Sequence, residues 1–346
     1  MKTFISITIG FVFFANLAVA MTTFSQGDIL SAGSMNQNFN HLQNQFGLNK
    51  TEVDCSSDNL TEKINQGYNH LSISGECTVD NIFAGLVDIS VFCGHSQSNN
   101  LVPRLKISGK TGKSTDKLTV SGSKNCDGNI SALMDGALEL ENLTIKTKYI
   151  NTMMGASIFV HDSILEKVGS EANVGAVKGS NIRLENVISS EDFGIFLDTG
   201  SSAQLRNFSS NGSMSLDYGS SFEGDNVTVK ALSMAASSGK VENLNIDCSS
   251  DGPCLTLYKS SSLEMLGSTI VGPSNRHSIY LERSELEVKN SSITPARDDS
   301  GEIIRILNSY LRIDIGNTIP GKIGCHTNSY TMGTSSLTTS GCTNFD

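Results

Sequence analysis

The chain has 346 residues, and its 25 basic and 35 acidic side chains give a net charge of −10 at neutral pH. An acidic chain repels nucleic acid, so nucleic acid is excluded as a partner. Its eight cysteines are typical of a protein exported into an oxidising compartment, where thiols pair.

Residues 1–20 are interpreted as a secretory signal. Lys2 precedes an apolar run from Phe4 to Phe14, and the tripeptide AVA before Met21 provides a cleavage site of the A-x-A type. The alternative is a membrane anchor, which the run disfavours because it is short for a bilayer span. No span is predicted elsewhere, so we expect a secreted protein that is periplasmic, extracellular or on the cell surface. Loss of Lys2 with the signal lowers the net charge to −11.

Residues 21–52 are predicted to contain a short helical segment. Within it, Met35, Phe39, Leu42 and Phe46 follow the spacing of the apolar seam of a coiled coil over barely two heptads. So short a helix is marginal on its own. Two interpretations stay open: the segment packs on the first coil of the domain that follows, or it associates with copies of itself, giving a homotrimer.

A second short helix is predicted at the start of the remaining domain, residues 53–346. Asp58 or Ser57 would cap it, Leu60 and Ile64 would face the core, and Gly67 would end it. Such a helix would cover the open end of the repeats that follow, as a solenoid requires.

From Gly136 onward the chain repeats one pattern. The stretch ALELENLTIK (137–146) alternates apolar and polar residues like a strand, except that Asn142 shifts the alternation by one position. Seven later stretches have the same shape, at a mean spacing of about 21 residues, which is typical of a solenoid with one coil per repeat. The eight corresponding positions are Asn142, Asp162, Asn186, Asn207, Asn226, Asn243, Gly267 and Asn290. Because Asn, Asp and Gly best tolerate left-handed backbone, each position predicts a corner.

Two kinds of solenoid have this period. A leucine-rich repeat places its Asn differently and carries a helical segment, whereas here each repeat adds a second short strand such as GIFLD (194–198) or IIRIL (303–307). The sequence therefore predicts an all-β, right-handed parallel β-helix. The x-L-x-N-L-x-I motif resembles the turn between the second and third sheets of pectate-lyase-like β-helix proteins, over roughly residues 53–320. That resemblance concerns the fold and implies a ladder of stacked asparagine side chains.

Eight cysteines allow on the order of 100 pairings, so the sequence alone does not fix the disulfides. In a solenoid, chain neighbours are spatial neighbours, and on that basis we predict the pairs Cys55–Cys77, Cys93–Cys126, Cys248–Cys254 and Cys325–Cys342, the last tying down a C-terminal cap. The sequence holds neither C-x-x-C nor H-E-x-x-H, and its six histidines are scattered. No zinc site is therefore predicted.

Alternation along the strands predicts an outward strip of aromatic and basic side chains. If Ile195 points inward, Phe196 points outward, and the same reasoning turns out three candidate ligand-binding residues on later coils. These are Tyr258, Tyr280 and Arg305. Such a strip would suit stacking on a sugar ring, so a polysaccharide or a cell-surface glycan is the expected partner.

The same alternation places Asp198 and Asp217 outward, one strand spacing apart. Two such carboxylates repel each other, and a Ca²⁺ ion between them would relieve the repulsion. The alternative is a pair of solvated aspartates without a metal, and this is the interpretation we favour, so no cofactor is expected apart from this candidate Ca²⁺.

The family resemblance implies two possible chemistries, both on acidic polysaccharides. Pectate-lyase-like activity needs several acidic residues on Ca²⁺ and a basic residue, while polygalacturonase-like activity needs D-D, G-H-G and R-x-K. The sequence lacks G-H-G, and Asp298-Asp299 is interpreted as a solvated turn. We therefore predict no catalytic residue and favour a non-catalytic binding or structural protein. The alternative is a polysaccharide lyase with an atypical Ca²⁺ site.

Overall fold

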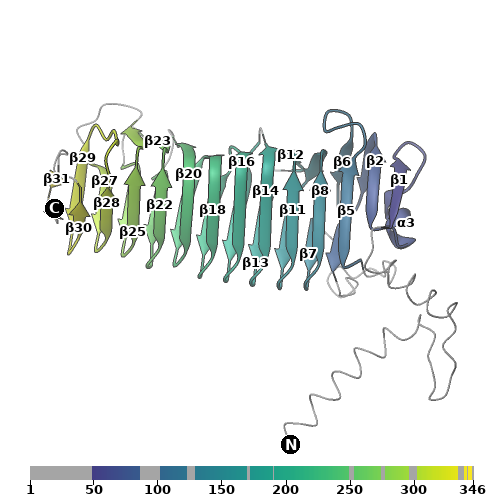
Figure 1. The fold of residues 1–346 in the computed structure, drawn as a ribbon, viewed down its shortest axis with the longest axis horizontal. Coiled ribbons are helices and arrows are strands. Elements are labelled where there is room, and N and C mark those ends of the chain that lie inside the picture. Colours follow the sequence, from purple (N-terminus) through teal and green to yellow (C-terminus); the bar gives the residue numbers. More distant parts are fainter. Residues whose placement is uncertain are drawn as a thin grey trace, which may run out of the picture.

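The computed structural model describes residues 49–85, 102–122, 129–169, 172–189, 191–248, 253–273, 277–295, 302–333, 339–340 and 342–344. Within these ranges the chain winds into an all-β parallel solenoid of about 11 coils (Figure 1). The predicted β-helix is confirmed. The predicted signal, nearly all of the segment 21–52, the pair Cys93–Cys126 and the turn Asp298-Asp299 lie outside the described residues.

Twenty strands form the first two faces of the solenoid, which meet at the asparagine corner. The first face consists of β1 (Lys50–Asp54), β2 (His70–Ser74), β5 (Arg104–Gly109), β8 (Ala137–Glu141), β11 (Ser157–His161), β22 (Ser262–Leu266), β25 (Glu285–Lys289), β28 (Tyr310–Ile313), β30 (Tyr330–Met332) and β32 (Thr343–Asn344). The second face consists of β3 (Glu76–Val79), β6 (Lys117–Val120), β9 (Thr144–Thr147), β12 (Ile164–Lys167), β23 (Thr269–Gly272) and β26 (Ser292–Pro295). Four longer strands run through both faces: β14 (Asn181–Ile188), β16 (Ser202–Ser209), β18 (Ser221–Val229) and β20 (Ser238–Asp247).

A separate sheet of twelve strands forms the third face. Its strands are β4 (Ile82–Gly85), β7 (Asn129–Leu133), β10 (Tyr149–Met153), β13 (Ala172–Val177), β15 (Phe193–Asp198), β17 (Ser213–Asp217), β19 (Ala231–Ala235), β21 (Leu255–Tyr258), β24 (Ile279–Glu282), β27 (Glu302–Leu307), β29 (Lys322–His326) and β31 (Thr339–Ser340). Each strand pairs in parallel with the equivalent strand of the next coil, so residues in register form rows along the solenoid axis.

The predicted corners between the first and second faces are confirmed. All eight predicted positions have left-handed backbone, with φ between 48° and 62°. The amide of Asn186 donates to the carboxylate of Asp162 (2.9 Å), that of Asn207 to Asn186 (2.8 Å) and that of Asn226 to Asn207 (2.9 Å). The implied ladder therefore spans four coils. It stops at Asn243, whose amide donates to Asp225 instead (3.3 Å).

A second column of corners, between the third and first faces, was not predicted. Residues of many types have positive φ there, among them Met154, Thr199 and Tyr218. Each of these corners from the fifth coil onward is followed by a buried serine whose hydroxyl donates to a backbone carbonyl two or three residues earlier. The serines are Ser180, Ser201, Ser220, Ser237, Ser261, Ser284, Ser309 and Ser329. These bonds satisfy carbonyl groups that a buried turn would otherwise leave without a partner.

The core is a set of inward-pointing rows of aliphatic and aromatic side chains. Large and small residues alternate between coils where space requires it. Phe222 lies between Ala203 and Gly239 in one row, and a β-carbon at Gly239 would collide with the Phe222 ring. Burial of each large apolar side chain contributes roughly 1.5–3 kcal/mol, so the rows supply most of the stability of the solenoid.

The N-terminal end is closed by the helix α3 (Leu60–Asn65), which packs on β1 and β3 with Leu60 buried. Its cap is Asn59, whose side chain accepts from the backbone N–H of Glu62, so the predicted cap at Ser57 or Asp58 is wrong. Asp58 accepts instead from the N–H of Asp54 and closes the preceding turn. The solenoid also begins earlier than predicted, because Lys50–Asp54 already forms a paired strand.

Three of the four predicted disulfides are formed: Cys55–Cys77, Cys248–Cys254 and Cys325–Cys342. Cys55–Cys77 and Cys325–Cys342 join neighbouring coils, and Cys248–Cys254 closes the short connection between β20 and β21. Among the described residues, no helix is long and apolar enough to cross a membrane.

Candidate functional site

The third face presents its outward side chains in rows along the axis. One row runs through Asn129, Tyr149, Asn173 and Gly194 on β7, β10, β13 and β15. The neighbouring row begins with Ser131, Asn151, Gly175 and Phe196 and continues through Ser215, Ser233, Thr256, Tyr280 and Arg305. A third row holds Val177, Asp198, Asp217, Ala235, Tyr258 and Glu282.

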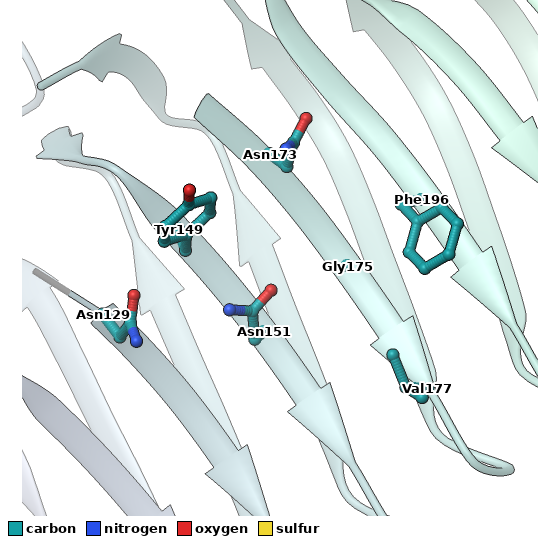
Figure 2. A pocket seen from close by; sticks show the side chains of 7 residues that line it. All are labelled: Asn129, Tyr149, Asn151, Asn173, Gly175, Val177 and Phe196. Carbon is teal, nitrogen blue, oxygen red and sulfur yellow. The ribbon is translucent and has the colours of Figure 1, made fainter. Parts of the chain in front are cut away.

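A hollow of about 330 Å³ lies at the N-terminal end of these rows (Figure 2). Tyr149 on β10 and Phe196 on β15 stand on either side of it, in neighbouring rows and on strands that are two spacings or about 10 Å apart. Between them lies Gly175, which has no side chain to fill the space. The remaining lining residues are Asn129, Asn151, Asn173 and Val177.

The glycines on the third face allow the asparagine amides to lie flat. A β-carbon at Gly175 would approach Oδ1 of Asn151 to 2.9 Å, and one at Gly194 would approach Oδ1 of Asn173 to 2.5 Å. Each amide therefore reaches across the neighbouring strand at a place where any larger residue would displace it. The side-chain oxygen of Asn129 is buried and has no hydrogen-bond partner among the described residues. The hollow thus combines two aromatic rings with amide donors and acceptors.

No residue that lines the hollow is charged. The nearest charges flank it: the ammonium of Lys148 lies 5.0 Å from the centre of the Tyr149 ring, and Asp198 follows Val177 in the third row. A ligand in the hollow would therefore meet rings and amides before it met any ionised group. Such a surface suits an uncharged, hydroxyl-rich molecule.

The structure places the sequence-predicted residues on this face but in two separate groups. Phe196 lies in the hollow and is 37% exposed. Tyr280 lies four strand spacings further along the same row, about 19 Å away, beside Arg305. Tyr258 is on the strand next to Tyr280 but one row over, where it pairs with Glu282. The outward orientation and the neighbouring coils are as predicted, and a ligand-binding role stays a prediction.

Tyr280 is already engaged by neighbouring groups, whereas Arg305 is not fully paired within the described ranges. The Tyr280 hydroxyl donates to Glu282 (3.2 Å), and its ring lies 5.5 Å from that of His277. Burial, followed by this bond to Glu282, raises the pKa of Tyr280, while the charge of Arg305 opposes the rise. The Nε atom of Arg305 is buried and unpaired among the described residues.

Asp198 and Asp217 occupy neighbouring strands of the third row, as predicted. Burial and then the charge of Asp198 raise the pKa of Asp217, and Lys259 partly offsets this. One carboxylate oxygen of Asp198 is buried without a hydrogen-bond partner in the described part of the chain. The repulsion between the two carboxylates is therefore only partly relieved, and whether a cation lies between them stays a prediction.

Two features of the structure depart from what the sequence alone suggests. The strands that carry Asp217 and Tyr258 are not consecutive: β19 lies between them, and its short ALSMA strand has a weak sequence signature. Lys106 and Lys117, on either side of the basic stretch SGKTGKS, lie on strands and pair with carboxylates of later coils and are not part of a solvated loop. Coil stacking supplies those partners, which sequence neighbours do not.

The lining of the hollow other than Phe196 was missed. Its strands, β7, β10 and β13, carry Asn and Gly at outward positions, which are poor strand formers and conceal the alternation. The regular recurrence of Asn129, Asn151 and Asn173 at intervals of 22 residues is a signal that could have found it.

Comparisons with known proteins give little beyond the architecture. No family model matches the chain, and no curated protein matches it. The catalytic domain of a GH87 α-1,3-glucanase in complex with nigerose aligns over 86% of this chain and 68% of its own, with 12% identity and a TM-score of 0.36. A variant of that domain with the same ligand aligns over the same shares with 11% identity and a TM-score of 0.33. Similarity this low carries no information on what the present chain binds.

Proposed function

We propose that the third face binds an uncharged polysaccharide and that the hollow between Tyr149 and Phe196 is its principal site. The observation that carries the proposal is the lining of the hollow: two aromatic rings on strands about 10 Å apart, with amides between them and no ionised group. Aromatic faces stack on the apolar faces of sugar rings, and amides match their hydroxyl groups. The site is open along the strand rows, which suits a polymer better than a small ligand.

The charge of the chain supports an uncharged ligand. At a net charge of −10, the protein repels acidic glycans over the range of a Debye length, about 10 Å at moderate ionic strength. Asp198, at the border of the hollow, adds to this repulsion. A neutral glycan pays no such penalty, and its binding depends little on salt.

The test is binding to a glycan array and then affinity measurement for the best neutral ligand. Phe196→Ala is expected to weaken binding at least tenfold without a change in melting temperature, since the side chain lies outside the core. Tyr330→Ala is the matched control, because Tyr330 is an aromatic residue on the first face with similar exposure, 40% against 37%. Equal affinity for Phe196→Ala, Tyr149→Ala and the unmodified chain would refute the site.

A second candidate function, a Ca²⁺-dependent polysaccharide lyase, is favoured by one observation: the repelling pair Asp198 and Asp217 beside the hollow. Ca²⁺ takes about 6–8 oxygen ligands, so the pair would need oxygens from water or from an acidic sugar. The lyase hypothesis predicts Ca²⁺-dependent release of unsaturated uronates, abolished in Asp198→Asn. Glycan binding that is unaffected by chelation, with no product formed, favours the binding protein.

A further inference from the structure

Three potential metal ligands converge on the first face, away from the hollow. Glu139 and Glu141 project outward from β8, and His161 projects from β11 on the next coil. One ligand atom from each side chain lies within 4.8 Å of the other two. Among the described residues this is the one place where three such side chains meet.

The imidazole of His161 is held in a single orientation. Its Nδ1 lies 3.1 Å from a carboxylate oxygen of Asp162, while its Nε2 lies 3.1 Å from an oxygen of Glu139. A neutral imidazole has one N–H, so a proton donated to Asp162 leaves a lone pair on Nε2 that faces a carboxylate. That contact is unfavourable unless positive charge lies beside it. The Lys106 ammonium, 2.8 Å from the same oxygen of Glu139, provides such charge, and a metal ion bound by both groups would provide it in place of Lys106.

The chain departs from its own pattern to supply Asp162. Seven of the eight corner positions carry Asn or Gly, and the one Asp follows His161 directly. Its second oxygen accepts a hydrogen bond from Asn186 (2.9 Å), which fixes the carboxylate toward the imidazole. A carboxylate that orients a metal-binding histidine through its far nitrogen is a common feature of metal sites.

The surroundings hold the histidine rigid. The side chain of His161 is only 13% exposed and stacks on Phe159, with ring centres 4.4 Å apart. The guanidinium of Arg183 lies over the Phe159 ring, 4.7 Å from its centre. Elsewhere on the first face, the carboxylates of Glu264 and Glu287 also pair with a lysine, Lys289, but no imidazole joins them among the described residues.

A cationic group already marks the position between the carboxylates. The ammonium of Lys106 lies 2.8 Å from Glu139 and 2.6 Å from Glu141. Lys106 is thus a built-in competitor for any metal ion at this place.

We propose that Glu139, Glu141 and His161 bind a divalent transition-metal ion such as Zn²⁺, with Asp162 as the positioning residue for His161. One imidazole and two carboxylates are ligands that Zn²⁺ accepts, and three protein ligands leave a coordination position open. Binding displaces the Lys106 ammonium into solvent. The proposal is independent of the glycan site, which lies on another face.

The test is calorimetric titration of the full chain with Zn²⁺. The unmodified chain is expected to bind one equivalent, and His161→Ala is expected to lose at least tenfold in affinity. His326→Ala is the matched control, since His326 lies 3.4 Å from Glu302 but no third ligand joins them among the described residues. Equal weakening in both histidine variants would overturn the proposal.

Two further variants keep the test decisive if His161→Ala is unstable. Asp162→Asn retains a side chain suited to the corner and is expected to weaken binding by about 10–100-fold through lost orientation of His161. Lys106→Gln removes the competitor and is expected to tighten binding, an effect that a purely structural ion-pair network does not produce. Absence of binding in both the unmodified chain and Lys106→Gln would overturn the proposal.

Discussion

The first and third faces are built from the same coils, yet one presents charged side chains and the other, around the hollow, presents uncharged ones. On β5, β8 and β14, the first face shows Lys106, Glu139 and Arg183, each paired with an opposite charge. On β10, β13 and β15, the third face shows Asn151, Gly175 and Phe196 without a charge among them. The inward rows and the corners are alike behind both faces. The outward positions are therefore free to differ, and the architecture alone carries no function.

The difference extends to how each region treats a carboxylate. Asp116, at the turn between β5 and β6, is fully buried and accepts hydrogen bonds from the backbone of Gly75, Thr111 and Gly112. Burial opposes its ionisation, but these bonds outweigh it and lower its pKa. Asp217 on the third face accepts no such bonds from the described residues, and burial together with the charge of Asp198 raises its pKa. Backbone N–H groups thus stabilise the charged carboxylate of Asp116, whereas the surroundings of Asp217 disfavour its charged form.

The largest expected effect comes from the core that both faces share. Leu184 is fully buried in β14, in register with Val160 and Leu205 on the adjacent coils. Leu184→Ala is expected to lower the free energy of unfolding by about 2–5 kcal/mol, because the lost contacts leave a cavity between coils. Chemical denaturation measures the loss. Glu185→Ala, the next residue outward, is the control and is expected to cost under about 1 kcal/mol; similar losses for both would show that the inward rows do not dominate stability.

A smaller effect is expected at the corner that separates the first and second faces. Asn186 has φ 55°, donates to Asp162 and accepts from Asn207. Asn186→Ala is expected to cost roughly 1–3 kcal/mol through lost hydrogen bonds and left-handed strain. Asn186→Gly loses the same bonds without the strain and is expected to cost less. If thermal and chemical unfolding give equal losses for both variants, strain plays no part in the preference for Asn.

The corners and inward rows could be predicted from the sequence, and the reason is physical. Left-handed backbone restricts the residue type at Asn142 and its counterparts, and alternation along a strand separates Ile195 from Phe196. The nearest-neighbour nature of a solenoid also gave three observed disulfides. In each case a local rule determines the outcome.

The hollow and the metal-ligand cluster could not be predicted, because the register between coils determines which side chains become neighbours. Tyr149 and Phe196 are 47 residues apart, and only the pairing of β10, β13 and β15 shows that a glycine lies between them. Glu139 and His161 meet through the pairing of β8 with β11. A search for local zinc motifs misses such a cluster, since its ligands come from two coils. Coil lengths vary, so the mean period does not fix the register.

The smallest expected effect is a difference in pH dependence between the two carboxylates contrasted above. The pKa of Asp217 in the folded chain lies above its ordinary value of 3.8, so its stabilising contribution is full below that value and is lost as pH rises through the folded pKa. Asp116 has a lowered pKa, so its contribution is present above 3.8 and is lost as pH falls. At neutral pH, Asp217→Asn is therefore expected to raise the melting temperature slightly and Asp116→Asn to lower it. The effect at Asp217 is small because solvent screens a half-exposed group.

Melting temperatures of both variants between about pH 3 and pH 7 measure these effects. Asp198→Asn is the control, since it removes the neighbouring charge and should reduce the gain from Asp217→Asn. A melting temperature that falls in both single variants at neutral pH would mean that Asp217 is stabilised by its neighbours, and the contrast between the two regions would not hold.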